Sequence, residues 1–104
     1  MQADMNLQVW LDIQSANGMA QVVPYVASAQ EADLQYELKL RARSGNAASS
    51  LAQAGTLHVV PGQPTRVSSL TVSQPPGSEC EVGLVLRQGM AVLGRYKLDC
   101  SGRK

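Results

Sequence analysis

The sequence predicts an all-β domain, and three observations support that prediction. Apolar and polar residues alternate with a period of two in several runs, as they do in half-buried strands. Clusters containing Gly, Pro and Asn interrupt these runs at short intervals, which is typical of turns between strands. The chain has 104 residues, enough for a single modest core. We therefore expect one domain over residues 1–104, with its core at about residues 5–100 and short flexible tails.

Two strands begin the predicted fold. Residues 7–14 alternate strictly, and Asn17-Gly18 follows as a tight-turn signal because both residues tolerate positive φ. The apolar run at residues 19–29 predicts the second strand. It contains Pro24, which cannot donate a hydrogen bond to a ladder, so we expect an edge strand or a bulge there.

The third predicted strand, residues 34–43, has the clearest pattern in the chain. Its even-numbered residues are Leu, Tyr or Ala, and its odd-numbered residues are polar. One side must face a core, so the other displays Lys39, Arg41 and Arg43 in a line. The small residues that follow, 44–50, predict a flexible loop.

Four more strands complete the prediction. They are separated by segments rich in Gly and Pro and are expected at residues 56–60, 65–72, 79–87 and 91–100. The turns between the later ones are expected at residues 61–64, 74–77 and 88–90. Seven short strands with regular turn signals predict an immunoglobulin-like seven-stranded β-sandwich.

Cys80 and Cys100 are the two cysteines of the chain, and their spacing fits neither a metal site nor a Cys-x-x-Cys motif. Both occupy apolar positions in the last two predicted strands, so both should face the core from one hairpin. We favour a disulfide, which would contribute about 3 kcal/mol for a loop of about 20 residues. The alternative is a pair of reduced, buried thiols in a cytosolic protein.

Two registers are open for this last hairpin. If the cysteines lie directly opposite each other, Glu81 faces Asp99, which is an unfavourable pair of like charges, and the turn centres on Met90. A slip of two residues pairs Glu81 with Lys97 and centres the turn on Gly89, where positive φ is easy.

Composition limits the classes of protein that the chain can represent. Charged residues are 16% of the sequence, below the usual value of about 25%, and the net charge is +1. Global charge therefore gives no argument for nucleic-acid binding. No window approaches the roughly 18 apolar residues of a membrane helix, and no signal peptide is visible. We expect a cytosolic protein or an exported protein without its leader, and the predicted disulfide favours export.

A basic surface emerges when the strands are assembled. In such a sandwich the third, sixth and seventh strands share one sheet. Their outward positions would gather six of the nine basic residues on one face, which we call the basic face: Lys39, Arg41, Arg43, Arg87, Arg95 and Lys97. We expect this face to bind a partner. The alternative is an ordinary polar face, because Glu37, Glu81 and Asp99 are interspersed and exposed cations discourage aggregation.

Little in the sequence predicts catalysis. His58 is the single histidine and so the sole candidate for a Ser-His-Asp arrangement, but no Gly-x-Ser-x-Gly elbow accompanies it. A metal site would need His58 together with the two cysteines of the hairpin. We expect no enzyme activity, no cofactor and no metal. Trp10 and Tyr25 offer aromatic faces, so an immunoglobulin-like adhesion or carbohydrate-binding module is the alternative function.

Three segments resemble the CsgC/CsgH family of curli-assembly proteins. They are residues 20–26, 40–45 and 57–64, the last leading into residues 70–73, and the resemblance covers roughly residues 7–98. CsgC carries a Cys-x-Cys pair near the start of its third strand, where this chain has Glu31-Ala-Asp-Leu34. A thiol-redox role is therefore not implied, and the CsgH branch is favoured.

The resemblance implies a periplasmic protein of immunoglobulin-like fold that keeps a CsgA-like curli amyloid subunit from nucleating fibres. It sharpens the hypothesis for the basic face, because complementary charge speeds the encounter with an acidic partner. Binding at an exposed edge strand by β-augmentation is the weaker alternative. We expect a monomer that neither inserts in a membrane nor binds nucleic acid.

Overall fold

The computed structural model describes residues 7–73, 75 and 77–101, which form eight strands in two antiparallel sheets. The strands are β1 (Gln8–Ala16), β2 (Met19–Ala27), β3 (Ala32–Ser44), β4 (Ala47–Val59), β5 (Thr65–Arg66), β6 (Leu70–Ser73), β7 (Glu79–Gln88) and β8 (Ala91–Asp99). Within these ranges there is no helix, and hence none suited to crossing a membrane. The all-β prediction is confirmed. The predicted tails and part of the turn at 74–77 lie outside the described residues.

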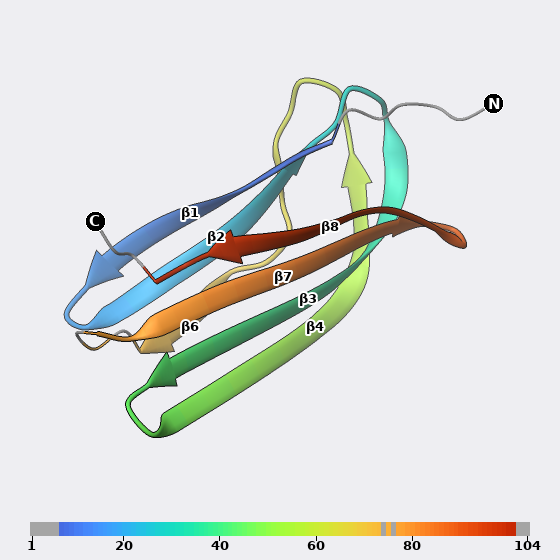
Figure 1. Ribbon diagram of the computed structural model, residues 1–104. Coiled ribbons are helices and arrows are strands. Elements are labelled where there is room, and N and C mark those ends of the chain that lie inside the picture. The colour runs from blue at the N-terminus through green and yellow to red at the C-terminus, as the bar shows by residue number, and fades with distance from the viewer. Residues whose placement is uncertain (1–6, 74, 76, 102–104) are drawn as a thin grey trace.

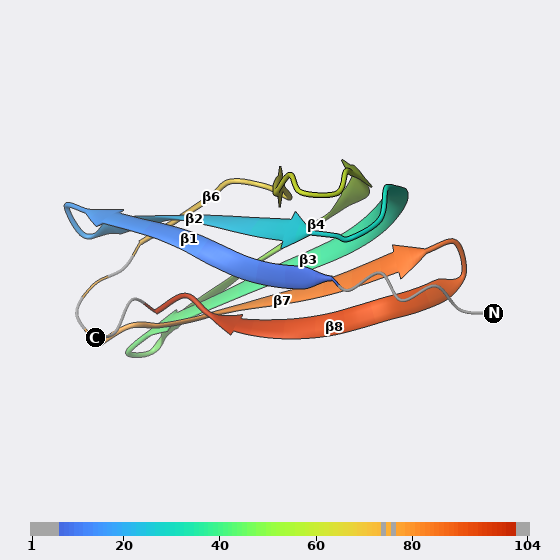
Figure 2. The same cartoon turned by 90° about the horizontal axis from the view of Figure 1, so that it is seen from above.

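The two sheets form two layers. In one sheet β2 pairs with β1 on one side and with both β5 and β6 on the other; the second sheet has the order β4-β3-β7-β8. Figure 1 shows the four strands of the second sheet side by side, and Figure 2 shows the two layers. The third, sixth and seventh predicted strands correspond to β3, β7 and β8, so their expected placement in one sheet is confirmed.

The core lies between the facing sides of the two sheets. It consists almost entirely of Leu, Val and Ala side chains, as a chain without Phe requires. Val22 of β2, Leu38 of β3 and Leu84 of β7 are completely buried there. The strict alternation of β3 is explained by this packing, because every second side chain enters the core and the others face outward.

Of the two alternatives predicted for Pro24, the edge strand is wrong, whereas the ladder opposite it is irregular like a bulge, since residues 67–69 lie against only two residues of β2. β2 is a central strand, and its pairing with β1 is continuous. Pro24 lies where the ladder on the other side is interrupted, between β5 and β6, and its carbonyl accepts a hydrogen bond of 2.8 Å from the backbone N–H of Val67. The N–H and C=O of a strand residue point to the same side. The N–H that Pro24 lacks would therefore point into this interruption, where no strand partner could accept its hydrogen bond, and so its absence removes no bond of the ladder.

The same interruption divides the fifth predicted strand. Residues 65–72 form two short strands, β5 and β6, because the chain leaves the ladder after Arg66 and rejoins it at Leu70. Val67 is buried between them. The structure therefore has eight strands in its described residues where the sequence predicted seven.

The flexible loop predicted at residues 44–50 is also wrong. A two-residue turn at Gly45-Asn46 connects β3 directly to β4, and Gly45 adopts a φ of +58°. From Ser44 opposite Ala47, the pairing continues without a shift over all 13 residues of β4. Ala and Ser have weak intrinsic preference for strands, so pairing with β3 determines the conformation of this segment.

The last hairpin combines features of both predicted registers. Glu81 lies opposite Asp99, as in the first register, and the adjoining cysteines form a disulfide with their Cα atoms 4.9 Å apart. A shift between Leu86 and Arg87 then moves the turn, so that Gly89 occupies it with a φ of +61°. Because of this irregularity, the two cysteines lie opposite each other and a glycine still occupies the turn. Each of the two predicted registers provided only one of these features.

Candidate functional site

The register of the second sheet brings the six cations of the basic face to the same side. Direct cross-strand partners share a face, and one row of partners runs from Lys39 through Gly83 to Lys97. The same pairing places Arg41, Arg43, Arg87 and Arg95 on this side of the sheet. Their position is observed; their role in binding a partner stays a prediction.

Acidic residues lie beside the cations in one part of the basic face. Arg41 of β3 lies opposite Glu81 of β7, and Arg43 lies opposite Glu79. Glu81 thus has a cation on one side and Asp99 on the other. Sequence reasoning missed Glu79 as a member of this face because it placed that residue at a strand start, although its parity with Glu81 gives the position.

Arg87 is more constrained than the other cations. It forms an ion pair with Glu37 of β3, and both side chains are partly covered. Its Nε atom is buried and has no hydrogen-bond partner among the described residues. Arg87 therefore contributes less free charge to the basic face than the exposed residues do.

The row through Lys39 and Lys97 is the part of the basic face where positive charge is least compensated. Both lysines are exposed, and Gly83 between them has no side chain. No carboxylate in the described part of the chain forms an ion pair with either lysine. An approaching anionic group would meet two ammonium groups in the same row, one on β3 and one on β8, with β7 between them.

An open groove of about 750 Å³ lies at one end of this face. Residues of all four strands line it, including the cations Arg41, Arg43 and Lys97 and the carboxylates Glu79, Glu81 and Asp99. The groove therefore combines cations with carboxylates and with the hydroxyl of Ser50 from β4, a polar lining suited to a polar polypeptide.

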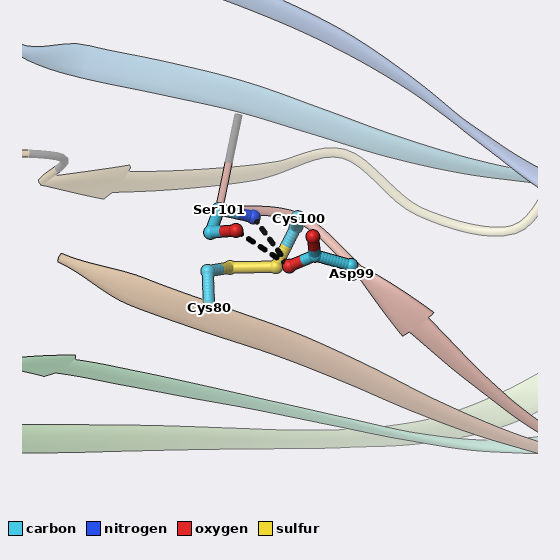
Figure 3. Close-up of a disulfide and its surroundings, with 4 residues drawn as sticks. All are labelled: Cys80, Asp99, Cys100 and Ser101. Carbon is cyan, nitrogen blue, oxygen red and sulfur yellow. Dashed lines mark hydrogen bonds between the residues drawn. A yellow bond between two sulfur atoms is a disulfide. The ribbon is translucent and has the colours of Figure 1, made fainter. Parts of the chain in front are cut away.

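A disulfide links the last two strands at the same end of the sheet. Figure 3 shows the Cys80–Cys100 disulfide joining β7 to the end of β8. Beside it, the Asp99 carboxylate accepts hydrogen bonds from the backbone N–H of Ser101 at 3.0 Å and from its hydroxyl at 2.6 Å. These bonds solvate the Asp99 charge and so reduce its repulsion of Glu81.

Small side chains of β4 lie next to the cations of β3 on the basic face. Ala48, Ser50 and Ala52 are the cross-strand partners of Arg43, Arg41 and Lys39, respectively. Sequence reasoning missed this part of the face because it treated the segment as a loop. The dipeptide Gly45-Asn46 is the signal that could have found it, since Gly-Asn is a recognised two-residue hairpin loop.

Comparison with known proteins identifies solved structures of the same fold. No family model matches the sequence, and no curated protein matches it. CsgH of R. palustris has a TM-score of 0.75 at 15% sequence identity, covering 91% of this chain and 93% of CsgH. The E. coli curli protein CsgC has a TM-score of 0.72 at 16% identity, covering 89% of this chain and 94% of CsgC. The fold is that of CsgH and CsgC. The resemblance seen in the sequence is thus confirmed as structural similarity to these two proteins.

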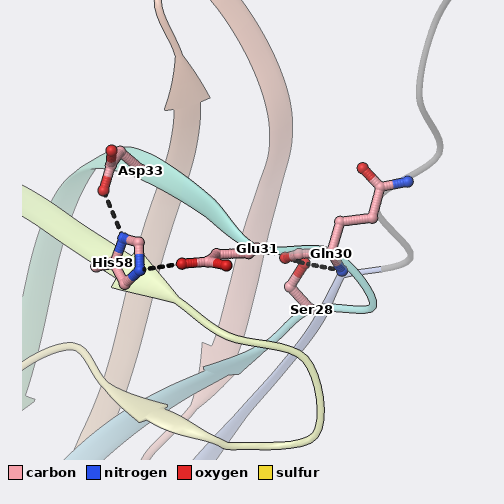
Figure 4. Close-up of polar contacts among 5 residues, drawn as sticks. All are labelled: Ser28, Gln30, Glu31, Asp33 and His58. Atoms are coloured by element: carbon pink, nitrogen blue, oxygen red, sulfur yellow. Dashed lines mark hydrogen bonds and ion pairs between the residues drawn. The ribbon is translucent and has the colours of Figure 1, made fainter.

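His58 lies between two carboxylates at the opposite end of β4. Its Nδ1 is 2.7 Å from Asp33 and its Nε2 is 2.8 Å from Glu31 (Figure 4). Both contacts raise the pKa of His58 above its ordinary value of about 6.5, and the hydrogen bond with Asp33 makes the largest contribution. Because both ring nitrogens face carboxylates, neither is placed to take a proton from a serine, and the arrangement does not fit a catalytic triad.

Trp10 and Tyr25 lie on the outward face of the other sheet. They are direct cross-strand partners, and their rings stack with centroids 5.8 Å apart. Trp10 remains 37% exposed. Each ring covers part of the other, so the pair presents less open aromatic surface than two separate rings would. Carbohydrate binding at this position stays a prediction.

Proposed function

We propose that this chain is a non-enzymatic periplasmic inhibitor of curli fibre formation, which contacts an acidic region of the amyloid subunit through the basic face. Similarity to CsgH and to the curli protein CsgC supports a role connected with curli. The Cys80–Cys100 disulfide supports an oxidising compartment, and the two packed sheets support an immunoglobulin-like description of the fold. The row from Lys39 to Lys97 is the observation that carries the electrostatic part of the proposal.

The charge distribution favours fast and short-lived contacts. Complementary charge raises the rate of encounter more than it deepens affinity, and exposed ion pairs contribute only about 0–1 kcal/mol each. The net charge of the whole chain is +1, so attraction is confined to the face where cations gather. A protein with these properties can meet many subunits in turn, which is what inhibition at low molar ratio requires.

Neutralising the least compensated row tests this proposal. In the double variant Lys39→Gln/Lys97→Gln, we expect the delay of fibre formation by a purified curli amyloid subunit, followed by thioflavin fluorescence, to be largely lost. Both side chains are exposed and without ion pairs to described residues, so the free energy of unfolding should change by less than about 0.5 kcal/mol.

A matched control separates the position of the charge from its amount. Arg66→Glu changes the net charge equally, but Arg66 lies on the outward face of the other sheet, opposite Tyr25. This control should delay fibres as the unmodified protein does. Added salt should weaken inhibition by the unmodified protein. If the double variant delays fibres as well as the unmodified protein, the basic face is not the contact surface.

A further inference from the structure

The free edge of β4 is the least protected strand edge of the second sheet. Among the described residues β4 pairs with β3 alone, so one of its sides carries backbone groups without a strand partner. No Lys, Arg, Asp, Glu or Pro occurs in its 13 residues, and the six from Ala47 to Ala52 are all exposed. Charged side chains and Pro are the usual means of blocking such an edge.

The turn determines which backbone groups point outward. A two-residue hairpin turn is closed by a hydrogen bond between its flanking residues, here Ser44 and Ala47. In an antiparallel ladder such hydrogen-bonded pairs alternate with pairs whose N–H and C=O groups point away. The outward groups of β4 therefore belong to the even-numbered residues, beginning with Ala48, Ser50 and Ala52.

These same residues hold the small side chains beside the β3 cations. A strand added to β4 would lie about 10 Å from β3, because neighbouring strands are about 4.8 Å apart. The Ala and Ser side chains of β4 are short and leave the space above this strand open. The long Lys and Arg side chains of β3 can therefore extend across β4 toward the added strand.

We propose that the outward edge of β4 and the cations Lys39, Arg41 and Arg43 form one binding site for an extended polypeptide segment with acidic side chains at alternate positions. The backbone edge supplies hydrogen bonds by β-augmentation, and the cations select acidic residues on the outer face of the added strand. This inference rests on the proposed function and makes it more specific, because it unites the basic face and the edge strand in a single contact.

The other face of the added strand suits an apolar residue. Leu51 of β4 lies opposite Leu40, whose side chain is buried in the core, yet Leu51 itself is 44% exposed. An added strand would therefore find an apolar neighbour on the inner side and cations on the outer side. The segment that fits best alternates acidic residues with small apolar ones.

A second copy of this chain fits the edge less well. Two β4 edges joined in an antiparallel way around a two-fold axis would form one continuous sheet, with both basic faces on the same side. The two rows of three cations would then repel each other across the junction. Charge complementarity thus favours an acidic segment of a different protein.

The test uses a short fluorescent peptide in which Glu alternates with Val and Thr, and measures its binding by fluorescence anisotropy at low salt. Ser50→Pro removes an outward N–H without removing a bond to β3, and we expect it to lower the affinity about tenfold. Ser50→Thr retains the N–H and is the matched control, with affinity unchanged. Ser50→Glu leaves the backbone intact but places an acid opposite Arg41, and should also weaken binding.

The outcomes separate this inference from the proposed function. Loss of binding with Ser50→Pro and Ser50→Glu, but not with Ser50→Thr, supports the inference. Unchanged binding with Ser50→Pro overturns it, as does equal binding of a peptide with Lys in place of Glu. Self-association abolished by Ser50→Pro, without peptide binding, would assign the edge to a second copy and also overturn it. The proposed function is tested independently by the fibre assay with Lys39→Gln/Lys97→Gln.

Discussion

The two edges of the second sheet, β4 and β8, are built in opposite ways. β8 carries Arg95 and Lys97 on its outward face, follows an irregular pairing near the turn, and ends at a disulfide. β4 has no charged residue apart from His58 and pairs with β3 without a shift. Charges and irregular pairing are devices that prevent strand addition.

The difference between β4 and β8 shows how one sheet can resist the addition of a strand at one edge and allow it at the other. An all-β protein that meets an amyloid-forming partner must not itself become a template for indefinite sheet growth. In the proposed role, the charges and irregular pairing of β8 would prevent strand addition on one side, while the cations beside β4 would restrict which segments pair on the other. The following changes are expected to weaken one edge at a time.

The largest effect is expected from removing the constraint on β8. Cys80→Ala/Cys100→Ala should lower the free energy of unfolding by about 3 kcal/mol, because the unfolded chain regains the freedom of a long loop. Urea unfolding measures the loss, and hydrogen exchange should accelerate more in β8 than in β4. Reductant should destabilise the unmodified protein similarly and leave the double variant unaffected. Equal acceleration in both edge strands would contradict a specific role of the disulfide in holding β8.

A smaller effect is expected at the turn that forms β4. Gly45 has a φ of +58°, so Gly45→Ala should cost about 1–2 kcal/mol of stability. Exchange of amide hydrogens should accelerate in the exposed half of β4 and not in β8. Asn46→Ala is the control at the adjacent position, where φ is not positive, and should change stability by less than about 0.5 kcal/mol. If both substitutions cost the same, the turn conformation does not determine the stability of this edge.

The smallest effect is expected at the other end of β4, where His58 contacts Asp33 and Glu31. Its folded-state pKa is raised, so its stabilising contribution is fully present below the unfolded pKa of about 6.5 and is lost as pH rises through the folded value. The difference in urea midpoint between the unmodified protein and His58→Gln should therefore shrink as pH rises from about 5.5 to 8. A difference that stays constant with pH would show that the two carboxylates do not stabilise the charged imidazole.

The alternation in residues 34–43 was sufficient to predict β3, its buried side and the orientation of its cations. Cysteine parity likewise predicted the disulfide. The segment at residues 44–50 could not be predicted as a strand from composition, because its residues are small on both faces and it gains its conformation from β3. The edge-strand alternative for Pro24 failed for a related reason, because the interruption between β5 and β6 that accommodates this proline in a central strand lies far from it in the sequence.

The all-β class, most strand positions and the side of each strand that enters the core can be predicted from the sequence, since these follow from local alternation and from turn residues. The identity of the edge strands, the register of the last hairpin and the pairing of acids with cations became evident from the folded protein. Those features depend on pairing between residues far apart in the chain, where backbone hydrogen bonds and core packing act together. The site proposed on β4 belongs to this second class.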